Sequence, residues 1–233
     1  MKHGILYNVG VGPGDPELLT LKAVRILREC TVIAIPQMKK DSCVAYQIAR
    51  QAVPQIEEKD CLCLHMPMTK DKETLEKSYK EAAEQVKKVL QDGKDVALLT
   101  LGDSTIYATS LYIQERIQKE GFSSCMVNGI PSFCAAAARL NLALVSGAEQ
   151  LHIIPASYPA QEAEKWSGVK VLMKAGSKVG DWKRALIEDG TQDVKMVERC
   201  GMEGERICLS AQDIPEDAGY YSLFILKDKK EDL

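Results

Sequence analysis

Residues 5–16 read ILYNVGVGPGDP and carry an apolar stretch, residues 5–9, through a glycine-rich turn into the start of a helix. Asp15 is a favourable residue just before a helix. Pro16 suits the first helical position, because its φ already matches a helix and its missing N–H would have no partner there. A second apolar stretch follows at residues 31–35. The order strand, turn, helix, strand predicts a β-α-β unit, which places the two strands parallel in one sheet.

The rest of the first half repeats this alternation. Residues 96–101 form the continuous apolar run VALLTL, which is typical of a parallel strand covered on both faces. Further helices are expected at residues 72–91, 105–120 and 132–139. After Leu144, short strand-like stretches become more frequent and helices shorter. We therefore predict an α/β protein of two α/β domains, with a mainly parallel sheet in residues 1–143 and a mixed sheet in residues 144–233.

Composition and charge exclude several classes of function. The chain has 233 residues and a formal net charge of −3, and no stretch interleaves basic with aromatic residues. Binding to nucleic acid is therefore not expected. No apolar run approaches the roughly 20 residues that span a bilayer, and the first residues do not resemble a secretory signal. We expect a cytoplasmic protein with no membrane partner.

Eight cysteines are scattered along the chain without a C-x-x-C pair. Only Cys61 and Cys63 lie close together in sequence, and we expect them to point to opposite faces of a strand and to make a poor pair of metal ligands. Eight thiols without a disulfide pattern indicate a reducing compartment. The sequence therefore predicts no metal site.

The turn Gly10 to Asp15 resembles a dinucleotide-binding loop at first sight. The G-x-G-x-x-G pattern, however, needs its third glycine where Asp15 stands, and Pro13 removes a backbone donor that a pyrophosphate would use. No G-K-[ST] follows for a nucleoside triphosphate either. A tight turn that caps a helix and a ligand-binding loop of another kind both remain open.

A second candidate site, LGDSTIY at residues 101–107, follows the predicted central strand. Ligands bind at the carboxyl ends of such strands, and Gly102 allows a close approach of the backbone. Asp103 is able to hold a ligand hydroxyl or an ammonium group, or to cap the following helix, and the two roles are compatible.

The remaining motifs are less specific. Residues 128–139 are rich in small side chains, which allow close packing against either a flat ligand or the sheet. Two later strands are expected to end near Met173 and Cys200. With three histidines in the chain and no nucleophile elbow, no hydrolase triad is predicted.

Taken together, three motifs resemble those of the tetrapyrrole (class III) methyltransferases, in the same order and spacing. These are VGVGPGDPELLTLKA at residues 9–23, GDSTIY at 102–107 and GIPSFCAAAARL at 129–140. The last helix, followed by LHIIPA at 151–156, looks most like the enzymes that methylate C20 of precorrin-2 or cobalt-factor II. One departure is Ser104, where the family usually has a proline; we expect it to loosen the loop without removing Gly102 or Asp103.

The resemblance implies two α/β domains with S-adenosylmethionine in the cleft between them, conversion of this cofactor to S-adenosylhomocysteine, and a homodimer. It implies direct transfer of the methyl group to a tetrapyrrole without a covalent enzyme intermediate. Carried over by motif, the cofactor contacts are Pro13, Leu101, Gly102, Asp103, Ile106, Pro131, Ser132, Met173 and Cys200. Asp103 and Tyr107 are weak candidates for the base that removes the meso proton.

The substrate implied by the resemblance carries many carboxylates, so basic side chains are expected to bind it. The candidates near predicted loop or strand ends are Lys39, Lys40, Arg139, Lys174 and Arg199. Three alternatives stay open: a family member that methylates another ring position, one that acts on a diphthamide precursor or ribosomal RNA, and a non-catalytic tetrapyrrole or nucleoside-binding protein. Whether the substrate already holds cobalt is also open.

Overall fold

The computed structural model describes residues 3–155 and 166–229. It consists of two compact units, residues 1–131 and 132–233. Within the described residues, no helix is both long enough and apolar enough to cross a membrane.

The first unit contains a five-stranded sheet in the order β3-β2-β4-β1-β5. All neighbouring strands are parallel. The strands are β1 (Leu6–Gly10), β2 (Val32–Ile35), β3 (Asp60–Cys63), β4 (Val96–Thr100) and β5 (Ser124–Val127). All residues of β4 are buried, as the apolar run predicted, and the parallel sheet expected for this half is confirmed.

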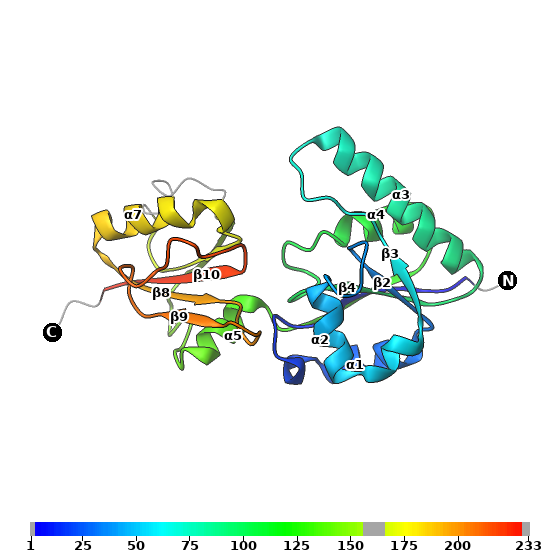
Figure 1. The fold of residues 1–233 in the computed structure, drawn as a ribbon, viewed down its shortest axis with the longest axis horizontal. Coiled ribbons are helices and arrows are strands. Elements are labelled where there is room, and N and C mark those ends of the chain that lie inside the picture. Colours follow the sequence, from blue (N-terminus) through cyan, green and yellow to red (C-terminus); the bar gives the residue numbers. More distant parts are fainter. Residues whose placement is uncertain (1–2, 156–165, 230–233) are drawn as a thin grey trace. The chain divides into compact units, whose positions relative to one another are not determined.

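Helices cover both faces of this sheet (Figure 1). One face packs against α3 (Lys72–Gln91) and α4 (Leu111–Lys119), where Leu98 lies in the same apolar cluster as Val86 and Ile113. The opposite face is covered by α1 (Leu21–Glu29) and α2 (Val44–Ala52). Successive residues of a strand face opposite sides, so a sheet covered in this way needs apolar residues at every position of its central strands.

Two helices of the first unit begin later than the sequence predicted. After Pro16 the chain forms only the short 3-10 helix η1 (Pro16–Leu18), and α1 begins after Thr20, whose hydroxyl accepts a hydrogen bond from the Ala23 N–H at 3.1 Å. The helix expected from residue 105 begins at Leu111. In both places residues assigned to a helix instead form the loop that leaves a strand.

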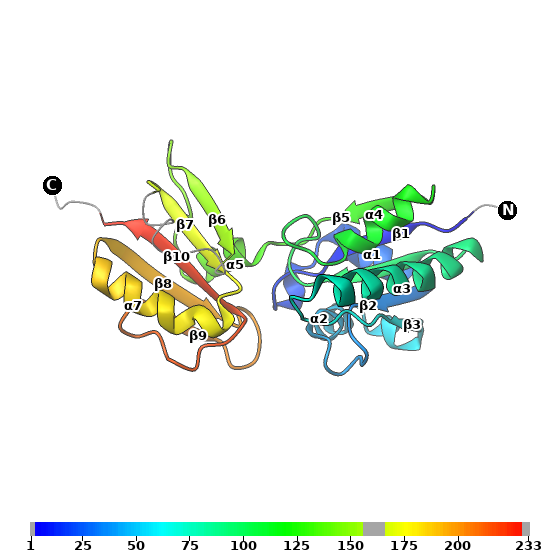
Figure 2. The ribbon, with the colours of Figure 1, turned by 90° about the horizontal axis from the view of Figure 1, so that it is seen from above.

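The second unit contains a mixed five-stranded sheet in the order β6-β7-β10-β8-β9 (Figure 2). Its strands are β6 (Leu151–Pro155), β7 (Val169–Met173), β8 (Gln192–Glu198), β9 (Arg206–Cys208) and β10 (Ser222–Asp228). Only β6 and β7 are parallel; the other pairs are antiparallel. The mixed sheet predicted for the second half is therefore confirmed.

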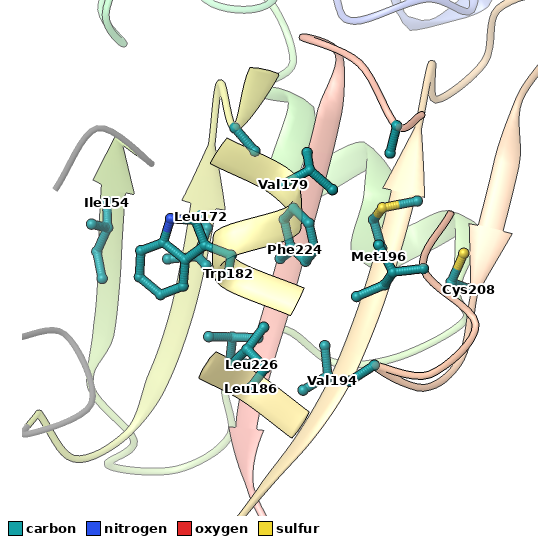
Figure 3. Packing of buried hydrophobic residues seen from close by; sticks show 14 residues of the cluster. Ile154, Leu172, Val179, Trp182, Leu186, Val194, Met196, Cys208, Phe224 and Leu226 are labelled. Atoms are coloured by element: carbon teal, nitrogen blue, oxygen red, sulfur yellow. The ribbon is translucent and has the colours of Figure 1, made fainter. Parts of the chain in front are cut away.

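The core of the second unit lies between this sheet and α7 (Val179–Asp189). Trp182 and Leu186 of the helix pack with Phe224 of β10 and Met196 of β8 (Figure 3). The helix α5 (Ser132–Arg139) contacts β10 and belongs to this unit. The division of the chain thus falls between Pro131 and Ser132, earlier than the boundary expected at residues 143–144.

Candidate functional site

The candidate site lies at the carboxyl ends of β1 and β4, which are neighbours in the first sheet. The chain leaves β1 toward α1 on one face and leaves β4 toward α4 on the other. Such a reversal opens a crevice, where ligands bind in open α/β sheets. Two backbone hydrogen bonds join the loops there, from the Gly12 N–H to the Gly102 oxygen at 3.1 Å and from the Gly102 N–H to the Gly12 oxygen at 2.8 Å.

A third loop, which follows β5, packs directly on these two. A Cβ atom on Gly10 would lie 2.6 Å from the Gly129 nitrogen and 2.7 Å from the Gly102 oxygen, so the three backbones touch only because glycine stands there. We call this contact of Gly10, Gly102 and Gly129 the glycine junction. Gly102 itself, with φ of 76°, would carry its Cβ into open space, with no atom within 4 Å. The three loops are thus in close backbone contact at the ends of their strands, while the space on the Cβ side of Gly102 stays open.

Asp103 is 5% exposed, and its carboxylate receives hydrogen bonds from two loops. Oδ1 accepts from the backbone N–H of Thr105 at 2.7 Å and from the Thr105 hydroxyl. Oδ2 accepts from the Gly129 N–H at 2.9 Å and from the Asn128 amide at 3.3 Å. Burial by itself raises the pKa of this carboxyl, but these hydrogen bonds outweigh it and lower the pKa below the ordinary value. Asp103 is therefore an anion fixed between the loops.

A buried polar network that the sequence analysis missed lies beneath the loop that leaves β4. Asn8, fully buried in β1, donates to Gln114 at 3.2 Å, and its Oδ1 accepts from the hydroxyls of Thr100 at 2.9 Å and Ser110 at 2.8 Å. Thr100 and Ser110 stand at the two ends of the loop, so Asn8 anchors both. The available signal was a lone asparagine inside an otherwise apolar strand.

Ser104 does not leave the loop loose, as we had expected. It is fully buried, and its hydroxyl donates to the carbonyl oxygen of Val127, the last residue of β5, at 3.2 Å. Where the family usually has the fixed φ of proline, this chain has a hydrogen bond to the neighbouring strand.

The predicted cofactor contacts of the first unit all belong to the three loops of the glycine junction. Pro13 is buried, whereas Leu101, Ile106 and Pro131 are half-buried. Tyr107, on the same loop as Ile106, is 45% exposed and has a φ of 49°, which is unusual for a residue other than glycine. The structure thus brings these residues to one end of the sheet.

Two of the three contacts predicted in the second unit, Met173 and Cys200, lie at the same end of its sheet. Met173 ends β7, and Cys200 follows β8; both strands run antiparallel to β10, so they end on the same side. The neighbouring basic residues Lys174 and Arg199 both have positive φ, 59° and 54°. Ser132 begins α5.

The other basic candidates have neighbours of their own. The Nε of Arg139 lies 2.6 Å from a carboxylate oxygen of Glu205, and the Nζ of Lys40 lies 5.4 Å from the centre of the Tyr46 ring. Lys39 and Arg199 are exposed. Arg199 directly precedes Cys200, one of the predicted cofactor contacts.

The expectation that Cys61 and Cys63 point to opposite faces was wrong. Residues two apart on a strand share a face, and the effect of Cys63 on the pKa of Cys61 agrees with this. Burial, with a smaller effect of Cys63, raises the pKa of Cys61 to about 11, so this thiol stays protonated at neutral pH. Within the described part of the chain, no group of three or more His, Cys, Asp or Glu side chains is arranged to hold a metal ion.

Comparison with known families decides what kind of protein carries this site. The model of the Tetrapyrrole (Corrin/Porphyrin) Methylases matches residues 5–214. The chain belongs to this family. The resemblance seen in the three motifs is thereby confirmed, and so is the predicted methyltransferase class.

Two curated relatives match along almost their whole length. The chain is 36% identical, over 95% of both sequences, to a probable cobalt-precorrin-2 C(20)-methyltransferase of Methanocaldococcus jannaschii. It is 29% identical to a precorrin-2 C(20)-methyltransferase of Sinorhizobium sp., over 98% of this chain and 97% of the relative.

Among solved structures, the fold is similar to that of a uroporphyrin-III C-methyltransferase from Thermus thermophilus complexed with S-adenosylhomocysteine. The TM-score is 0.71, the sequence identity is 20%, and the match covers 96% of this chain and 92% of the other. At this identity the likeness concerns the fold, and it agrees with the α/β architecture that the sequence predicted.

Proposed function

We propose that this protein transfers the methyl group of S-adenosylmethionine to C20 of a precorrin-2-type tetrapyrrole in the biosynthesis of cobalamin. Full-length relatives that carry this activity in their names support the choice of ring position. The observation that carries the proposal is the open space beside Gly102 at the point where the loops after β1, β4 and β5 meet.

The residues of these loops suit an adenosine-containing cofactor. Leu101 and Ile106 offer half-buried apolar side chains on either side of the Gly102–Asp103 turn, and Pro13 adds a buried apolar surface from the loop after β1. Sites for such ligands are mainly apolar, with a few fixed polar groups. When bound, S-adenosylmethionine supplies an electrophilic methyl group that carries its own leaving group, so the chain need not provide a covalent nucleophile.

The contribution of the chain is then chiefly to hold and orient. Correct placement of two reactants can lower the activation barrier by roughly 7–11 kcal/mol. Loops that are closely packed at the glycine junction are suited to maintain such a placement. Ser132, Met173 and Cys200 are the contacts we propose from the second unit. Arg199 is proposed to bind a substrate carboxylate.

The two candidates for the base differ in their surroundings. The carboxylate of Asp103 is engaged by four donors, and its lowered pKa makes it a weak base. Tyr107 exposes much of its ring on the same loop, and we keep it as the residue to test for proton removal. A homodimer in the cytoplasm, with no nucleic acid as substrate, completes the proposal.

An anaerobic assay with precorrin-2 and cobalt-factor II side by side tests this function. We expect product with one additional methyl group at C20, identified by mass and by the position of the label when the donor methyl is isotopically labelled. The preferred substrate decides whether cobalt is already present. A label at another ring carbon would point to a different ring specificity. Binding of S-adenosylhomocysteine without any product would favour a non-catalytic binding protein.

A further inference from the structure

We propose that Asp103 is a positioning residue, which aligns the loops around the cofactor and does not itself contact the cofactor. This inference rests on the proposed function, because it concerns the binding of the same methyl donor. It gives Asp103 a role different from the direct contact that the family resemblance implies.

The hydrogen bonds of Asp103 leave little capacity for a ligand. A carboxylate offers about four acceptor positions, and the protein supplies two donors to each oxygen. Oδ1 is filled by the backbone N–H and hydroxyl of Thr105, and Oδ2 by Asn128 and the Gly129 N–H. Because the residue is only 5% exposed, a ligand hydroxyl or ammonium would have to displace one of these donors from a buried site.

The same bonds connect two of the three loops, and a further bond extends the connection to the third. Thr105 belongs to Asp103's own loop, whereas Asn128 and Gly129 belong to the loop after β5. The carbonyl oxygen of Asn128 in turn accepts from the Thr20 hydroxyl at 3.2 Å, and Thr20 caps α1, the helix that follows β1. Asp103 thus stands at the start of a chain of contacts that runs from the β4 loop, through the β5 loop, to the first turn of α1.

The connection depends on a carboxylate in particular. An asparagine at position 103 has one oxygen and one NH₂ group, so one of its two sides would present donors to donors. Either the Thr105 side or the Gly129 side would then be unpaired. With the NH₂ group toward the β5 loop, the buried Gly129 N–H has no acceptor, which is costly and favours movement of this loop away from Gly102. With the NH₂ group toward Thr105, the bond that holds the turn at residues 103–105 is lost instead.

The first test measures the loops without any ligand. In hydrogen exchange on the full-length protein, Asp103→Asn is expected to speed exchange of peptides that cover residues 101–107 and 126–131, while peptides of β7 and β10 stay unchanged. Asp15→Asn is the matched control, because the Asp15 carboxylate also accepts from the backbone N–H two residues further on, that of Glu17 at 2.8 Å, but among the described residues it accepts no hydrogen bond from another loop. Thermal unfolding of each variant verifies that it is folded. Asn128→Ala, which removes one weaker donor, is expected to give a smaller change in the same peptides.

The second test separates alignment from contact. Calorimetry measures the binding of three ligands to wild type and to Asp103→Asn. The ligands are S-adenosylhomocysteine, its analogue without ribose hydroxyls, and its analogue without the α-amino group of the homocysteine moiety. If Asp103 acts through the loops, the substitution weakens all three ligands by the same factor, about tenfold or more. If Asp103 bound a hydroxyl or the ammonium group, the effect would vanish for the analogue that lacks that group.

Each outcome decides between the two roles. Faster exchange together with a uniform loss of affinity supports the proposal. Loss of affinity without a change in exchange, an effect that depends on the ligand group, or faster exchange with unaltered affinity would overturn it. Failure of the proposed function looks different: wild type itself would then not bind S-adenosylhomocysteine, or would bind it and give no C20-methylated product in the anaerobic assay.

Discussion

Gly102→Ala probes the open space on which the proposed function depends. With φ at 76°, an alanine at this position adopts a left-handed backbone at a cost of about 1–2 kcal/mol. Its methyl group meets no protein atom within 4 Å, so backbone strain is the only penalty in the free protein. For a chain of this length we expect Tm to fall by about 2–8 °C.

Gly121→Ala supplies the matched control. Gly121 ends α4 with φ of 84° and has equally open surroundings, but it lies at the opposite end of the helix from the candidate site. The two variants should therefore lose similar stability. Only Gly102→Ala is expected to lose affinity for S-adenosylhomocysteine, by at least about tenfold, since its methyl group occupies the space meant for the ligand.

Differential scanning fluorimetry and isothermal titration calorimetry on the two variants provide the measurement. Equal affinity of both variants for S-adenosylhomocysteine would refute the reasoning, because the space beside Gly102 would then not hold the cofactor. A much larger loss of stability in Gly102→Ala than in Gly121→Ala would show that the space is filled in the free protein.

Three further predictions concern the network, the substrate and pH. Asn8→Leu leaves the buried polar partners of Asn8 without a hydrogen-bonding partner at this position, which should lower the free energy of unfolding by about 1–3 kcal/mol per unpaired group. Urea denaturation measures this loss, and an unchanged midpoint would contradict the anchoring role. Arg199→Gln should raise KM for the acidic tetrapyrrole, most strongly at low salt, and leave the affinity for S-adenosylhomocysteine unaltered; a salt-independent effect would exclude an ionic contact. The lowered pKa of Asp103 makes its contribution to stability fully present above about pH 4 and lost as the pH falls through the lower folded value, so the difference in Tm between wild type and Asp103→Asn should shrink on acidification below about pH 4.

The sequence predicted the elements that depend on apolar periodicity. The buried run of β4 and the alternation of strands and helices were sufficient for the parallel sheet, and the shorter strands after Leu144 for the mixed one. Helix starts were less accurate, because the cap at Thr20 and the late start at Leu111 depend on loops that other loops hold in place. Local propensity contains no information on such contacts.

The candidate site was predicted only in part, because it too depends on contacts between residues that are distant in sequence. The motifs located Gly102 and Asp103 correctly at a strand end, since motif residues are close in sequence. The partners of Asp103 at Asn128 and Gly129, and the anchor at Asn8, come from other strands and were not found. The face shared by Cys61 and Cys63, by contrast, follows from the two-residue period of a strand alone.

The division between Pro131 and Ser132 falls inside the motif GIPSFCAAAARL, although the motif is continuous in sequence. Its first three residues belong to the first unit and the rest to the second. Gly129 is fitted to the backbones of Gly10 and Gly102, whereas α5 packs on the second sheet. Recombining halves of different family members, in order to redirect methylation to another ring carbon, should therefore succeed with a crossover directly after Pro131. A crossover at the more obvious loop near residue 143 would graft a foreign helix onto a sheet that did not evolve with it.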